Sequence, residues 1–255
     1  GLRLAADRPA AALPLQRRLV TAAEAELGAD APELVPMLET LAGLELVHGE
    51  PTDAVSLFTR AATIAGHGGD PTTASVMLAG AAREAVDAGA AGVALELAAR
   101  ALEAAPEPLD PYLMLPALTA RAEASWMLLR TPPESLRERF GVDAAPSVEE
   151  VVGLYTQLLE AQAAALPADH PDLARSRERS ARVALLAQDA GRGDLGRRLL
   201  ATAAAAGRAR LGPAHPRVVE TTLELARLQR DAGEPAAAAT TLEGLAATVE
   251  AERGE

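Results

Sequence analysis

The chain has 255 residues, of which 61 are alanine and 39 leucine, while valine and isoleucine together contribute 16 and aromatic residues 2%. Because strands favour β-branched and aromatic residues, this composition excludes most β architectures and predicts an all-helical protein. Much of any core must be alanine, which favours thin, closely spaced helices. The formal charge of −12 is opposite to that expected of a general nucleic-acid binder.

The chain lacks several residue types that particular kinds of site require. Cysteine is absent, which excludes disulfides, thiolate metal sites and a cysteine nucleophile. All 24 basic residues are arginine, and neither lysine nor asparagine occurs, which we interpret as the coding bias of a high-GC, bacterial type of genome. No apolar run is long enough to span a membrane, and residues 1–12 contain no apolar signal segment, so we expect a cytoplasmic location.

The chain repeats a helical hairpin. A shift of 184 residues aligns Leu27-Gly28 with Leu211-Gly212, and residues 49–51 with residues 233–235. In each repeat a proline begins a helix, where its missing N–H costs nothing, and a glycine in the left-handed conformation ends it. A second helix follows, with one apolar stripe at helical spacing. A single hairpin is too thin to bury this stripe, so stacked hairpins must supply the core.

One segment carries the pattern of a known family. Residues 211–216 read LGPAHP, Leu225-Ala226 follows, and Gly233 lies 18 residues after His215. This pattern resembles the tetratricopeptide repeat (TPR) of the 42-residue, kinesin-light-chain-like type. Its second-helix part recurs at residues 54–61 and 94–102. The resemblance implies a right-handed α-solenoid of stacked helix-turn-helix repeats, in which the first helices line a concave face.

In chain order, we expect one solenoid over residues 1–255. A partial unit, 1–26, precedes units at 27–68, 69–105, 106–165, 166–210 and 211–255. The third unit has helices at about 111–130 and 148–165, separated by an insertion at 131–147. Three prolines and a short helical segment at 135–140 predict that this insertion is an exposed excursion, which either carries function or acts as a spacer. The first helix of the fourth unit is expected to be about one turn longer than that of the fifth.

No catalytic, cofactor-binding or metal site is predicted. His170 and His215 occupy equivalent places in successive units, too far apart to share a metal ion, so we expect each to cap its own turn. Adjacent carboxylates such as Glu149 and Glu150 diverge on a helix and do not converge on a substrate. Trp126 either anchors a helix interface or contacts a ligand. Four arginines within residues 175–182 either contact an acidic peptide or form a solvated face.

The resemblance also assigns residues to the concave, partner-binding face. They are Glu39, Arg83, Arg121, Ser125, Arg182, Glu220, Glu224, Arg227 and Arg230. The groove lysines and asparagines with which this family grips chaperone C-termini, and the groove asparagines of kinesin light chains, are absent, so neither ligand class is carried over. Arginines in an acidic chain favour a partner with spaced acidic residues, because arginine forms bidentate contacts with carboxylates. Alternatively, these arginines pair only with neighbouring glutamates.

We therefore expect a non-catalytic protein–protein interaction scaffold rather than an enzyme. It binds a peptide or domain of a partner on its concave face, without cofactor, metal, nucleic acid or membrane span. The partner is a separate protein or another domain of the same full-length chain. The alternative function is a regulatory or sensor segment of a larger signalling protein, attached for example to a kinase or protease domain.

Overall fold

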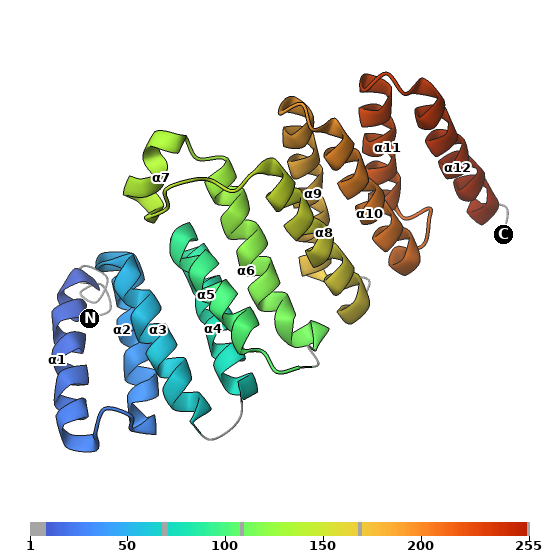
Figure 1. Ribbon diagram of the computed structural model, residues 1–255. Coiled ribbons are helices and arrows are strands. Elements are labelled where there is room, and N and C mark those ends of the chain that lie inside the picture. The colour runs from blue at the N-terminus through green and yellow to red at the C-terminus, as the bar shows by residue number, and fades with distance from the viewer. Residues whose placement is uncertain (1–8, 68–70, 108–109, 168–169, 254–255) are drawn as a thin grey trace, which may run out of the picture. The chain divides into compact units, whose positions relative to one another are not determined.

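The computed structural model describes residues 9–67, 71–107, 110–167 and 170–253, and these residues form helices and no strand (Figure 1). The elements are α1 (Pro9–Leu27), the 3-10 turn η1 (Pro32–Leu34), α2 (Val35–His48), α3 (Pro51–Gly66), α4 (Pro71–Asp87), α5 (Ala91–Ala104), α6 (Pro111–Leu129), α7 (Pro133–Phe140), α8 (Val148–Ala165), α9 (Pro171–Asp189), α10 (Gly193–Leu211), α11 (Pro216–Asp231) and α12 (Pro235–Arg253). They form two compact units, residues 1–145 and 146–255. The all-helical prediction is confirmed.

The first unit is a stack of helical hairpins. α2 packs against α3 and α4 against α5, so each pair forms one hairpin (Figure 1). α3 also packs against α4, which joins the two hairpins, while α1 covers α2 and α6 covers both α4 and α5. This arrangement confirms the predicted helix-turn-helix architecture of TPR type.

The second unit repeats the same arrangement. α9 and α10 form one hairpin, α11 and α12 form the next, and α10 packs against both α8 and α11. The two helices expected to pair in the third repeat, α6 and α8, belong to different compact units. A single solenoid over residues 1–255, with the repeat boundaries given above, stays a prediction.

Prolines and glycines mark the helix ends as the sequence predicts, with one exception. Gly89, Gly191 and Gly233 end α4, α9 and α11 with φ of 77°, 73° and 79°. Gly49, after α2, has φ of −123°, so the left-handed prediction is wrong there. A Cβ at Gly49 would lie 1.9 Å from Oε2 of Glu45. The glycine at this position makes room for a carboxylate.

That carboxylate is buried and pairs with a half-exposed arginine, a contact that the sequence did not reveal. The Glu45 side chain is buried on α2, and the Arg17 guanidinium of α1 donates to both of its oxygens at 2.8 and 2.9 Å. The hydrogen bonds and charge of Glu45 raise the pKa of Arg17 above its ordinary value. The pair fixes α1 on α2.

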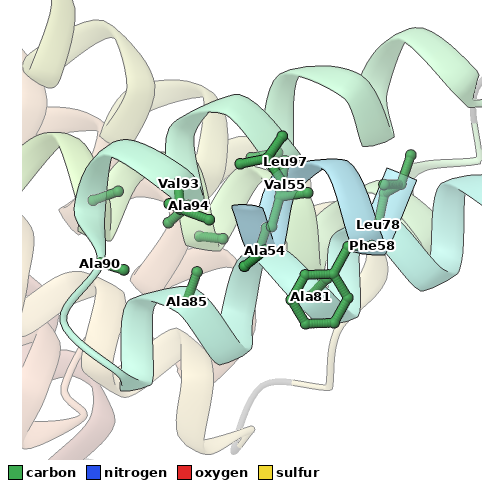
Figure 2. Packing of buried hydrophobic residues seen from close by; sticks show 14 of the residues in the cluster. Ala54, Val55, Phe58, Leu78, Ala81, Ala85, Ala90, Val93, Ala94 and Leu97 are labelled. Atoms are coloured by element: carbon green, nitrogen blue, oxygen red, sulfur yellow. The ribbon is translucent and has the colours of Figure 1, made fainter. Parts of the chain in front are cut away.

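The core of the first unit is built largely of alanine, as the composition predicts. Among the described residues, its main cluster has 23 buried members, of which 15 are alanine. Figure 2 shows part of it, with alanine side chains such as Ala54, Ala85 and Ala94 between the helices. Small side chains allow the helix backbones to approach closely. Trp126 is also buried, and it therefore acts as an interface anchor; the Arg130 guanidinium lies 5.2 Å from the centre of its ring.

The insertion is more ordered than the sequence suggests. It forms the two-turn helix α7, and Leu136 is 1% exposed within the core of the first unit. α7 packs against α5, where a Cβ at Gly92 would lie 2.1 Å from the carbonyl oxygen of Phe140. Most residues of the insertion are exposed, as predicted, but Leu136 and the contact at Gly92 attach it to the hairpins.

Candidate binding faces

In the first unit, the predicted face residues lie on α2 and α4, the first helices of the two hairpins, and on α6. Glu39 on α2, Arg83 on α4 and Arg121 on α6 are exposed to solvent. Neither arginine forms an ion pair with any residue that the structure describes. Ser125 on α6 differs, because it is 2% exposed and faces the helix packing. A partner on the surface therefore has access to the charged residues and not to Ser125.

Carboxylates gather where α2 and α4 meet. Oε1 of Glu84 on α4 lies 2.7 Å from the point where a Cβ at Gly43 of α2 would stand. Burial raises the pKa of Glu84, and the charges of Glu39 and Asp87 raise it further. Burial disfavours the charged carboxylate and is the larger effect, and the two neighbouring acidic charges add to it. Three carboxylates, those of Glu39, Glu84 and Asp87, therefore lie close enough to interact around α2 and α4.

In the second unit, the predicted arginines pair with acidic neighbours on their own helices. Arg182 contacts Glu178 on α9 at 2.6 Å. On α11, Arg230 contacts Asp231 at 2.8 Å, and Arg227 lies 3.7 Å from Glu224. These contacts match the alternative in which the arginines neutralise nearby carboxylates.

A groove runs along the exposed side of α11. It has a volume of about 580 Å³, and α12 contributes Val249 to its wall. Its lining residues are Ala214, Pro216, Val219, Glu220, Leu223, Glu224, Arg227 and Val249. Three of the predicted site residues, Glu220, Glu224 and Arg227, therefore meet in one concave surface. Oε1 of Glu224 is buried without a hydrogen-bond partner among the described residues, so this oxygen is left unsatisfied.

The arginine cluster of α9 does not form one surface patch. Arg175 and Arg182 are exposed, but Arg177 is 6% exposed and lies against Gly207 of α10. Its Nε and Nη2 atoms have no hydrogen-bond partner in the part of the chain that the structure describes. Burial lowers the pKa of Arg177, and the charge of Arg217 lowers it further. Because an unpaired buried charge costs free energy, we expect this guanidinium to destabilise the fold.

Both repeat-linker histidines cap helices. Nδ1 of His170 accepts the Asp172 backbone N–H, and Nδ1 of His215 accepts that of Arg217, each at 3.3 Å. The expected capping role is thus confirmed. Among residues 9–67, 71–107, 110–167 and 170–253, no cluster of three or more histidine, aspartate or glutamate side chains has metal-binding geometry. In the same ranges, every helix is too short or too polar to cross a bilayer.

The solved structures with similar folds include TPR-like repeats. Two are kinesin light chain TPR-like repeats from Podosopora anserina, which are nearly identical repeats. One, a single-substitution variant, is 20% identical over 88% of this chain and 98% of that chain, with a TM-score of 0.46. The other is 21% identical over 87% and 97%, with a TM-score of 0.45. BtubC (BKLC) from P. vanneervenii is 18% identical over 97% of this chain and 90% of that one, with a TM-score of 0.44.

No protein-family model and no curated protein sequence matches the chain. The stacked hairpins, with their proline starts and glycine ends, define the class of protein: an all-helical, TPR-like repeat protein.

Proposed function

We propose that this protein is a non-catalytic scaffold that binds a segment of a protein partner along the first helices of its hairpins. The observation that carries the proposal is the α11 groove, where apolar side chains and predicted charged residues line one concave surface. Apolar contacts flanked by charges are the usual chemistry of helix-in-groove recognition. The same faces serve a regulatory segment of a larger protein, in which the partner is another domain of the chain.

The partner is better matched by basic residues than by acidic ones. Three of the five predicted arginines are already paired with acidic neighbours. Several carboxylates remain available, because Glu39, Glu84 and Asp87 lie close together and Glu220 forms no ion pair with a described residue. Charge complementarity across an interface sets association rate and specificity. Of the predicted arginines, only Arg83 and Arg121 form no ion pair with a described residue and favour an acidic partner.

The test uses the whole chain as bait to capture a partner, followed by calorimetric titration of the purified pair at two salt concentrations. The double variant Glu39→Gln with Glu84→Gln should weaken the binding of a basic partner and reduce the salt dependence of that binding. The double variant Arg83→Gln with Arg121→Gln should instead weaken the binding of an acidic partner. Glu243→Gln on the exposed side of α12 is the matched control. Unchanged affinity in both double variants would remove the first-helix face of the first unit from the binding site.

A further inference from the structure

Helix α1 carries apolar side chains on two opposite faces. Its inner face packs Leu13 and Val20 into the core beside α2. On its outer face, Leu15 is 63% exposed and Leu19, one turn later, is 50% exposed. Arg18 lies three residues after Leu15, beside it on the same side of the helix. It is exposed and forms no ion pair with a described residue. The outer stripe of α1 is therefore an aliphatic surface with a free positive charge.

The α11 groove has the complementary pattern. Leu223 is 48% exposed, and Val219 precedes it by one turn on the same face. Glu220 and Glu224 flank these residues; Glu220 forms no ion pair with a described residue, whereas Glu224 lies 3.7 Å from Arg227 on the same helix. The groove therefore has an aliphatic floor flanked by two carboxylates. A helix that carries aliphatic side chains and an arginine on one face would be complementary to it in both polarity and charge.

We propose that α1 of one copy of this chain docks in the α11 groove of a second copy. The leucines of α1 cover Val219 and Leu223, while Arg18 faces Glu220 and Glu224. If the helices run parallel, a second charge pair also matches, because Glu26 then faces Arg227. The rise of a helix places Arg18 and Glu26 about 12 Å apart and Glu220 and Arg227 about 10.5 Å apart.

This contact is heterologous, because it joins two different surfaces. Each copy therefore carries one α1 stripe and one α11 groove, and loss of either surface leaves the other intact. The inference goes beyond the proposed function, since it does not depend on any other protein. It also predicts that self-association and partner binding compete at Glu220, Glu224 and Arg227.

The test is sedimentation velocity of the full chain over a range of concentrations. The native chain should form species larger than a monomer, whereas Leu15→Glu with Leu19→Glu and, separately, Leu223→Glu should each stay monomeric. A mixture of these two variants should form a heterodimer, because one keeps its groove and the other keeps its α1 stripe. Leu185→Glu, which changes an exposed leucine of α9 outside both surfaces, should associate like the native chain.

A charge reversal tests the pairing without removing any apolar side chain. Arg18→Glu should weaken association about tenfold or more. Adding Glu220→Arg and Glu224→Arg to the same chain should restore it. A native chain that is monomeric at every concentration, or a variant mixture that does not associate, would overturn the proposal. Circular dichroism of each variant confirms that the helices persist, and Arg18→Glu remains informative if the leucine variants lose helicity.

Discussion

The docking of the insertion on the first unit depends on one missing side chain. In Gly92→Ala, the new Cβ would lie 2.1 Å from the Phe140 carbonyl oxygen and 3.0 Å from Cγ2 of Val142. A backbone oxygen has no rotamer by which to move aside, so either α5 or the insertion must shift. Because α7 is held largely by Leu136, we expect the insertion to move.

The expected cost follows from two opposing effects. If the insertion stays in place, overpacking costs about 1–3 kcal/mol; if it moves away, loss of the Leu136 burial instead costs about 1.5–3 kcal/mol. Replacing a helical glycine with alanine gains about 0.5–1 kcal/mol. The net loss is therefore about 1–2 kcal/mol. For a unit of 145 residues, this corresponds to a decrease in Tm of roughly 2–8 °C.

Thermal unfolding and limited trypsin digestion measure this effect. Arg137 and Arg139 lie on α7, so displacement of the insertion should accelerate cleavage after these residues. Gly80→Ala on α4 is the matched control, because its Cβ would have no neighbour within 4 Å, and this variant should raise Tm slightly. A Gly92→Ala protein with unchanged Tm and unchanged cleavage would refute the docking of α7 on α5.

Three further predictions concern charged residues. The raised pKa of Glu84 means that this carboxyl binds a proton more tightly in the native state than in the unfolded state, so stability should fall as pH rises from the ordinary carboxyl pKa to the raised one. Glu84→Gln should therefore raise Tm at neutral pH and have no effect in acid. Calorimetry at a series of pH values would show this. Arg17→Met should lower Tm more than Glu45→Gln does. Arg17→Met leaves the buried Glu45 carboxylate unpaired, whereas Glu45→Gln leaves a half-exposed arginine in contact with water. Equal decreases in Tm would contradict this prediction. Arg177→Met should raise Tm by a few degrees in the same assay, since it removes a buried guanidinium with unpartnered nitrogens; a lower Tm would mean that the charge has a partner beyond those described.

The helices could be predicted from the sequence because their signals are local. The second helix of the third repeat was expected at 148–165, and α8 occupies these residues. Likewise, α9 has 19 residues and α11 has 16, which confirms that the first helix of the fourth repeat is the longer by about a turn. Proline starts and glycine ends act within a few residues, so their positions limit each helix independently of its neighbours.

The contacts between helices could not be predicted, because they join residues that are distant in the sequence. Nothing in the local pattern distinguishes Leu136 from a surface leucine on a charged segment, and nothing marks Gly92 as the glycine that receives Phe140. The charge of the candidate face shows the same limit. Its residues were placed from the repeat register, and Glu220, Glu224 and Arg227 do meet in one groove. Their ion pairs, however, depend on side-chain conformations that the register does not specify.

The alanine-rich core of the first unit also determines how stability responds to temperature. Each of its 15 buried alanines removes little apolar surface from water compared with a leucine or phenylalanine. The heat-capacity change of unfolding increases with the apolar surface exposed, by about 0.45 cal/mol/K per Å². This unit should therefore have a free energy of unfolding that varies gently over a wide range of temperature. A calorimetric heat-capacity increment below the roughly 12–15 cal/mol/K per residue of ordinary domains would be its signature.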